Sequence, residues 1–194
     1  MARGETKTKL LDVGREVFSE RGYNHAGIEA VLQAAGVPRG SFYNYFSSKE
    51  DFGLQVIDRL GACYEEELGR YLDDPTIRPL ERLRGYFQAT IDRLELNQCR
   101  KGCLVGTLGQ EMADQNEAFR MRLEEIFDRW ATRYAECIVL AQTERQIRGD
   151  LDPRDFAEFC LNSWQGAVLR AKTSRSTAPL RAFLIMVFDG LAAG

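Results

Sequence analysis

A tight turn followed at once by a short helix constrains this 194-residue chain more than any other feature. Gly36 can adopt the positive φ that ends a helix, and Pro38 suits the first turn of the next helix, where its missing N–H is not needed. On that next helix Phe42 and Phe46 are four residues apart and share one face. The pattern predicts a helix-turn-helix.

The remaining faces of the second helix carry side chains that suit a DNA groove. Arginine can reach a guanine edge or a phosphate, glycine allows close approach of the backbone, and tyrosine and asparagine can hydrogen-bond to phosphates. A short helix built only for packing would not need consecutive tyrosine, asparagine and tyrosine residues. The candidate DNA-contacting residues here are Arg39, Gly40, Ser41, Tyr43, Asn44 and Tyr45.

Residues 35–50 resemble, almost without interruption, a motif of the TetR family of bacterial transcriptional regulators, which reads approximately A-G-V-[SP]-[KR]-G-[ST]-[FL]-Y-x-[YH]-F-x-[SN]-K-[ED]. The resemblance implies an all-α fold of about nine helices, with a DNA-binding head over residues 1–47 and a regulatory, ligand-binding and dimerisation body over residues 48–194. It also implies that Lys49 contacts a phosphate. The chain departs from the family at Ala26-Gly27, where Thr or Ser is usual, and so lacks a phosphate contact or helix cap there.

Composition and charge narrow the class of protein. Hydrophobic residues make up 44% of the chain, and no window approaches eighteen consecutive apolar residues, so we expect a cytoplasmic protein without a membrane span or signal peptide. The net charge of −3 argues against nonspecific binding of nucleic acid. Residues 1–50 carry seven Lys and Arg against six Asp and Glu, and the remainder carries 19 against 23. A slightly basic head on an acidic body is compatible with DNA binding by the head.

Catalytic and metal-binding motifs are missing from the sequence. His25 is the only histidine, and it falls near the start of the second helix, where we expect it to touch phosphate or solvent. Any Cys-His or Ser-His pair would have to use it, which argues against nucleophilic catalysis. There is no CxxC pair, GxGxxG turn or GxxxxGK[ST] loop, so we expect no enzyme, metal or cofactor. A thiol-dependent enzyme acting on electrophiles is the alternative from another class.

Hydrophobic spacing predicts helices along the whole chain. They span residues 6–21, 27–35, 48–71 and 116–146, with others from Leu80 to Leu94, after Asp152-Pro153 and at the C-terminal end. Gly22 should end the first helix, and Ser47 and Glu50 have the spacing of a capping box. Asp152 should cap the helix that Pro153 begins.

A glycine-rich stretch is the second informative segment. Three glycines in eight residues make a continuous helix unlikely to pass through it, and a break at Gly102 would leave Cys103 near the start of a short helix. A thiol in that place, beside Arg100 and Lys101, should have a lowered pKa and hence more reactive thiolate. The segment resembles two subgroups of the TetR family, the electrophile-responsive NemR repressors and the acrylate-responsive AcuR repressors, which share its Gly-Cys-Leu. By that resemblance Cys103 is the candidate sensor, and Cys99 is a possible resolving thiol.

Two other interpretations of this segment stay open. Cys103 can instead be a small residue packed beside glycines, with a noncovalent pocket for acrylate or another small carboxylate that Arg100, Lys101 or the helix start would hold. The five cysteines, an odd number, indicate reduced thiols, and we expect core positions for the three that lie on apolar stripes, Cys63, Cys137 and Cys160. Aromatic candidates for a ligand pocket are Trp130, Tyr134 and Trp164, although ordinary packing is the alternative for each.

The last two expected helices are apolar on more than one face, which indicates a dimer interface. Gly166 would permit close approach of a second helix there. Two recognition helices held at a fixed distance read two half-sites of double-stranded operator DNA. Together these features predict a homodimeric repressor that a small-molecule effector releases from its operator; a protein partner in place of the effector is a further alternative.

Overall fold

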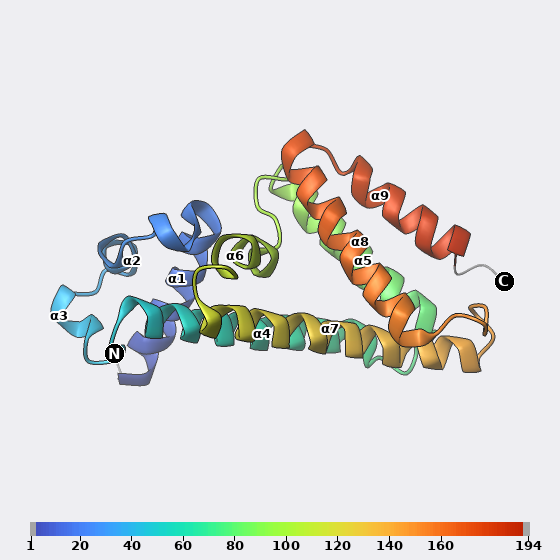
Figure 1. Cartoon of the computed structure of the whole chain (residues 1–194), viewed down its shortest axis with the longest axis horizontal. Coiled ribbons are helices and arrows are strands. Elements are labelled where there is room, and N and C mark those ends of the chain that lie inside the picture. Colours follow the sequence, from blue (N-terminus) through green and yellow to red (C-terminus); the bar gives the residue numbers. More distant parts are fainter. Residues whose placement is uncertain (1–2, 192–194) are drawn as a thin grey trace. The chain divides into compact units, whose positions relative to one another are not determined.

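The computed structural model describes residues 3–191 and consists there of helices without strands, so the all-α expectation is confirmed (Figure 1). A π-helix, which the spacing of apolar residues did not predict, continues the last α-helix. The elements are α1 (Arg3–His25), α2 (Ile28–Ala35), α3 (Arg39–Phe42), α4 (Lys49–Leu72), α5 (Pro79–Leu96), α6 (Leu104–Met112), α7 (Glu117–Thr143), α8 (Pro153–Ser174), α9 (Ala178–Leu184) and the π-helix η1 (Ile185–Leu191).

The chain forms two compact units. The head unit consists of the residues up to Cys63 together with Leu104–Glu125, and the body unit consists of Tyr64–Cys103 and the residues from Ile126 onward. Helices α4 and α7 therefore contribute residues to both units, and α6 belongs to the head unit although it follows α5 in sequence.

An aromatic cluster forms the core of the head unit. The rings of Phe42 and Phe46 lie 5.3 and 4.9 Å from the ring of Phe52 on α4, and Phe18 of α1 lies 5.8 Å from the same ring. All four side chains are buried. Burying a phenylalanine stabilises a fold by about 1.5–3 kcal/mol, so this cluster fixes the helix-turn-helix against α1 and α4.

The cap of α4 lies one residue later than the capping box that the sequence suggested. The N–H of Asp51 donates to Ser48 Oγ at 3.0 Å, and the N–H of Ser47 donates to Asp51 Oδ2 at 2.8 Å. The expected pairing of Ser47 with Glu50 is wrong because α4 begins at Lys49, which makes Ser48 the residue before the first turn. The bond from the Ser47 N–H, followed by one from the Gln55 side chain, lowers the pKa of the Asp51 carboxyl.

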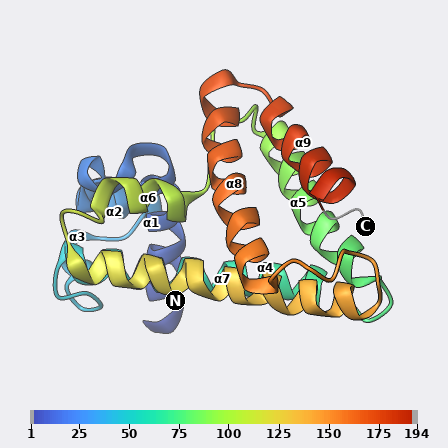
Figure 2. The same cartoon turned by 45° about the vertical axis from the view of Figure 1, so that its right-hand side comes forward.

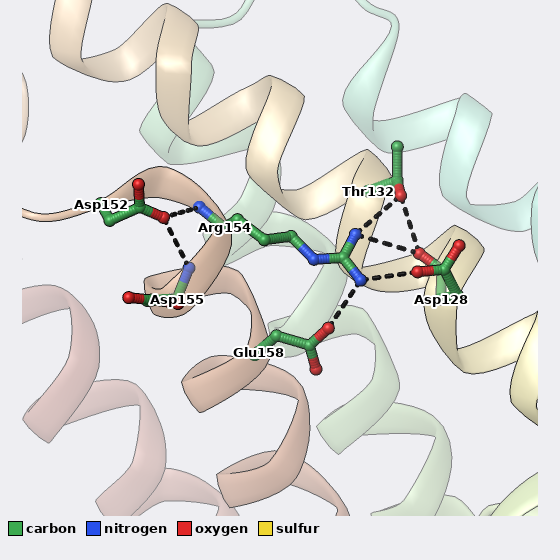
Figure 3. Close-up of polar contacts among 6 residues, drawn as sticks. All are labelled: Asp128, Thr132, Asp152, Arg154, Asp155 and Glu158. Atoms are coloured by element: carbon green, nitrogen blue, oxygen red, sulfur yellow. Dashed lines mark hydrogen bonds and ion pairs between the residues drawn. The ribbon is translucent and has the colours of Figure 1, made fainter.

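In the body unit, α9 packs against both α8 and α5 (Figures 1 and 2). The expected cap of α8 is confirmed, since Asp152 Oδ1 accepts from the N–H groups of Arg154 and Asp155 at 2.9 Å. Figure 3 shows how the Arg154 guanidinium then joins α8 to α7 by donating to Asp128 Oδ1 at 2.7 Å and to Thr132 Oγ1 at 2.8 Å. None of the helices between Arg3 and Leu191 combines the length and apolar character that a membrane span requires.

Candidate DNA interface and effector site

The turn before the expected recognition helix has the predicted backbone. Gly36 adopts φ 64° and ψ 35°, the left-handed conformation that ends α2, and the N–H of Val37 donates to the carbonyl of Leu32 at 3.0 Å. Pro38 stands directly before α3 rather than within its first turn. Helix α3 covers only Arg39–Phe42, and turns continue it to Tyr45. The helix-turn-helix is confirmed, with a shorter second helix than the spacing of phenylalanines suggested.

The candidate DNA-contacting side chains all reach the surface. Because Phe42 and Phe46 point inward, the opposite side of α3 and the following turn faces outward, and Tyr43 is 59% exposed. Arg39, Gly40 and Asn44 are also exposed, whereas Ser41 and Tyr45 are half-buried. The head therefore presents a continuous set of hydrogen-bonding side chains from one short segment.

An ion pair that the sequence analysis missed lies on this surface. Arg39 Nε is 3.0 Å from Glu29 Oε1 of α2, and both side chains are largely exposed. Exposed ion pairs of this kind stabilise a fold by only ~0–1 kcal/mol, so exchange of Glu29 for a phosphate group would cost the protein little.

The two remaining candidate phosphate contacts differ in their surroundings. His25 is exposed at the end of α1. Lys49 is half-buried, its Nζ donates to the carbonyl of Asn24 at 3.3 Å, and the same ammonium lies 4.5 Å from the centre of the Tyr23 ring. Burial lowers the pKa of Lys49, and the nearby carboxylate of Glu111 opposes that effect. Lys49 is thus held within the head unit by the last residues of α1, which follow the interruption at Gly22.

The same end of α1 contains the break that Gly22 was expected to produce. Gly22 has φ 73° and ψ 172°, which are not helical, and the chain turns from there through Tyr23 and Asn24 to His25. The carboxylate of Glu111 on α6 accepts from the N–H of Tyr23 at 2.8 Å and from the N–H of Asn24 at 2.7 Å. No sequence pattern indicated this contact, because its partners are 88 and 87 residues apart.

Cys103 stands where the break at Gly102 was expected to place it, directly before the nine-residue helix α6. Its side chain is half-buried. A methyl group added to Gly102 would lie 3.5 Å from Lys172 Cδ and 3.6 Å from Val168 Cγ1, so the loop passes close to α8. The predicted break and the start of a short helix after Cys103 are confirmed.

Three tyrosines from different helices interact with the Cys103 thiol. Burial raises the pKa of Tyr64, Tyr86 and Tyr134, and the negative charge of a Cys103 thiolate raises each of them further. All three hydroxyls therefore keep their protons at neutral pH and can act as hydrogen-bond donors. Tyr64 comes from α4, Tyr86 from α5 and Tyr134 from α7, and only Tyr134 was a candidate from the sequence.

A cation lies beside this tyrosine group. Arg93 of α5 lowers the pKa of Tyr64 and Tyr86 by its charge, although burial outweighs it. Its guanidinium donates to Glu67 Oε1 and, at 3.4 Å, to Thr90 Oγ1. Arg93 sits on the polar side of an ordinary amphipathic helix, so the sequence pattern did not mark it as a site residue.

The other candidate effector residues are placed in several environments. Trp130 and Trp164 are buried, and their rings lie 4.9 Å from that of Tyr64 and 4.7 Å from that of Phe87, respectively. Arg100 is exposed and donates to Gln98 Oε1 at 3.3 Å. Trp130 thus contacts the tyrosine group, whereas Trp164 packs within the body core.

The cysteines are all outside disulfides. Cys99 is buried at φ 52°, with its carbonyl accepting from Arg175 Nη1 at 3.1 Å. Cys137 and Cys160 are buried as expected, which raises their pKa to about 11 and about 12. Cys63 is only half-buried, so the expectation of a core position for it is wrong. Among the residues from Arg3 to Leu191, no three His, Cys, Asp or Glu side chains cluster as metal ligands would.

A helix-turn-helix with an outward-facing polar surface, followed by a helical body, defines a DNA-binding regulator. Comparison with known proteins supports this class. Residues 10–56 match the family model described as "Bacterial regulatory proteins, tetR family", and residues 79–187 match "Tetracyclin repressor-like, C-terminal domain". The chain belongs to the TetR family of transcriptional repressors.

Individual relatives cover nearly the whole chain. The HTH-type transcriptional repressor DhaR of Mycobacterium sp. (strain GP1) is 39% identical over 98% of this chain and 94% of its own. The transcriptional regulator AcuR of Cereibacter sphaeroides is 37% identical over 90% of this chain and 80% of its own. The crystal structure of the reduced form of Escherichia coli NemR has a TM-score of 0.88, with 30% identity and 98% of each chain covered. The two subgroups that Gly102-Cys103-Leu104 suggested are therefore among its relatives.

Proposed function

We propose that this protein is a homodimeric repressor that leaves its operator when a reactive electrophile adds to Cys103. The observation that carries the proposal is the half-buried Cys103 directly before α6, whose charge when ionised raises the pKa of three protonated tyrosines from α4, α5 and α7. Relatives that are named as repressors, DhaR and NemR, support the repressor role.

The DNA contacts of the proposed repressor come from α3 and its flanks. Arg39 and Tyr43 would contact base edges or phosphates, together with Gly40, Ser41, Asn44 and Tyr45, while His25 and Lys49 would contact phosphates from either side. Lys49 would have to exchange its bond to the Asn24 carbonyl for a phosphate oxygen.

Exposed apolar side chains on the last helices support the proposed dimer interface. Phe159 and Leu169 on α8 and Ile185 and Met186 on η1 are all 45–62% exposed. Gly166 lies on the exposed side of α8, with nothing within 4 Å of an added Cβ, which leaves room for a helix of a second copy. Pairing of these faces would set the distance between two recognition helices, as reading of two half-sites requires.

The chemistry at Cys103 would be conjugate addition. The thiolate attacks the electron-poor β-carbon of an α,β-unsaturated carbonyl compound, a carbon–sulfur bond forms, and the carbon–carbon double bond is lost. The α-carbon takes up one proton, equivalent to the one that the thiol released, so no oxidant is needed. A tyrosine hydroxyl donating to the carbonyl oxygen would stabilise the negative charge that develops there.

A noncovalent pocket for acrylate or another small carboxylate is the second candidate. The observation that favours it is the cation Arg93 beside the same tyrosines, because a guanidinium and phenol hydroxyls are suitable partners for a carboxylate. Arg93 is itself partly exposed and pairs with Glu67, so a carboxylate ligand would have to compete with Glu67 for it. In this second candidate mechanism Cys103 is only a packed side chain and does not react with the effector.

In either version the effector must favour one conformation over another. Release from DNA follows only if the body conformation that binds the effector, or that carries the adduct, holds the two DNA-binding heads at a distance that does not match the spacing of the major grooves. The change in DNA affinity then equals the difference between the effector's affinities for the two conformations.

The test starts from an operator selected with the purified protein from a pool of random double-stranded DNA. Binding of this operator is then measured for wild type, Cys103→Ser and the control Cys63→Ser, which removes the other half-buried thiol. The ligands are acrolein, acrylate and propionate, which share a three-carbon skeleton and differ in reactivity and charge.

Release of wild type and Cys63→Ser by acrolein, but not of Cys103→Ser, is the expected result. Equal release of all three proteins by acrylate would assign the noncovalent pocket instead, with propionate showing whether the double bond matters. Consumption of many equivalents of acrolein per protomer would identify an enzyme. If Arg39→Ala and Tyr43→Ala both bound the operator normally, the recognition-helix assignment would be wrong.

A further inference from the structure

Glu111 makes the most specific contact between α6 and the helices that carry the candidate DNA surface. Each of its carboxylate oxygens accepts one backbone N–H, from Tyr23 at 2.8 Å and from Asn24 at 2.7 Å. Because Gly22 has non-helical φ and ψ, Tyr23 and Asn24 begin a separate short turn, and the first N–H groups of such a turn are the ones that a capping side chain usually satisfies. Glu111 supplies from another helix the acceptor that a capping residue would normally supply.

Neighbouring contacts gather on the same two residues. The side-chain amide of Asn24 donates to Gln115 Oε1 at 3.2 Å, and the carbonyl of Asn24 accepts from Lys49 Nζ at 3.3 Å. The ring of Tyr23 lies 4.7 Å from that of Phe119 on α7. The segment Tyr23–Asn24 is thus held from α4, α6 and α7 within the head unit, and α2 of the helix-turn-helix begins four residues after Asn24.

The same helix is joined directly to the candidate sensor. Helix α6 begins at Leu104, the residue after Cys103, and Glu111 lies about two turns further along it. A helix moves as a rigid element, so a shift imposed at its first residue also reaches the carboxylate. The two oxygens can keep both bonds only while α6 stays in register with Tyr23 and Asn24.

We propose that Glu111 is a positioning residue that holds α1 and α2 in the DNA-binding arrangement, and that effectors act by moving α6 so that this bidentate contact is lost. The second half of the proposal rests on the proposed function, because it needs an effector event at Cys103. The first half does not, since it concerns only the protein without effector.

The experiment compares Glu111→Gln with wild type and with the control Glu117→Gln. Glu117 is an exposed carboxylate that pairs with Arg120 on α7, so its substitution makes the same change of charge without touching α1. A glutamine at 111 has one acceptor oxygen and turns its amide NH₂ toward the second backbone N–H. Operator affinity is measured with and without acrolein, and mass spectrometry gives the extent of Cys103 alkylation.

We expect Glu111→Gln to bind the operator about tenfold more weakly than wild type without acrolein, and to lose most of the further weakening that acrolein causes. Glu117→Gln should match wild type in both measurements, and all three proteins should be alkylated equally. Gln115→Ala removes the neutral bond from Asn24 and the bond that Gln115 Nε2 donates to the Glu111 carbonyl, and it leaves the Glu111 carboxylate in place. It should shift both quantities in the same direction by less, and it replaces Glu111→Gln as the test variant if that protein does not fold.

Two results would overturn the proposal. One is unchanged operator affinity in Glu111→Gln; the other is weaker binding with an undiminished response to acrolein, which would mean that Glu111 only stabilises the head. If instead wild type itself does not respond to acrolein, the proposed function fails, while the affinity of Glu111→Gln without effector still tests the positioning role.

Discussion

Substitution of Gly22 by alanine should destabilise the fold far more than substitution of a glycine in a turn usually does. Gly22 has φ 73° and ψ 172°, a region that essentially only glycine occupies, and another residue there costs ~1–3 kcal/mol. A Cβ at this position would also lie 2.7 Å from Glu111 Oε2, closer than Cβ contacts in proteins come, and 3.1 Å from Oε1. The carboxylate would have to move away from Tyr23 and Asn24.

The size of the effect follows from these two contributions. Loss of a hydrogen bond to a charged group costs about 1.5–3 kcal/mol when buried, and the two bonds here are only partly buried or exposed, so we assign roughly 1 kcal/mol to each. With the backbone strain, the expected loss in free energy of unfolding is about 3–5 kcal/mol. Urea denaturation at a fixed protein concentration measures it.

Gly36→Ala is the matched control. Gly36 also has a positive φ, of 64°, but nothing lies within 4 Å of an added Cβ, so this variant should lose only ~1–2 kcal/mol. In a Glu111→Ala background, Gly22→Ala should lose about 2 kcal/mol less than in wild type, because the carboxylate has already gone. A Gly22→Ala variant no less stable than Gly36→Ala would refute the reasoning.

Two further predictions concern the body. Burial raises the pKa of Cys160 to about 12, so above pH 9 the unfolded state releases this proton while the folded state keeps it, and stability falls as the pH rises. Chemical denaturation of wild type and Cys160→Ala should therefore show the stability advantage of wild type shrinking by roughly 1.4 kcal/mol between pH 8 and 10; a constant difference would contradict the assignment. Phe159→Glu places a charge on the exposed apolar side of α8 and should shift the protein from dimer to monomer in analytical ultracentrifugation, whereas Glu158→Gln on the same helix should not. If Phe159→Glu formed a dimer with the same dissociation constant as wild type, the proposal that α8 is part of the dimer interface would be wrong.

Local interactions explain the parts of the structure that were predicted correctly. Each of these features depends on residues within one or two helical turns of one another. They are the turn at Gly36, the phenylalanines four residues apart, the Asp152-Pro153 cap and the break at Gly102. Backbone conformation and helical periodicity at such positions are set by neighbours in the chain, so they can be read without knowing what packs against them. One error was also local: Ser48 rather than Ser47 caps α4, because a shift of one residue leaves the pattern nearly unchanged. The expected core position of Cys63 failed for a different reason, since burial depends on what packs against the helix.

The contacts of the candidate site were hidden from such reasoning because they join distant segments. The sequence of this protein specified a helix-turn-helix, a helical body and a cysteine at the start of a short helix. Tertiary packing alone put Tyr64 and Tyr86 near Cys103 and brought Glu111 to the N–H groups of Tyr23 and Asn24. Such partners leave no periodic signal, since a tyrosine in an amphipathic helix or a glutamate in a short one looks the same whether or not another helix lies opposite.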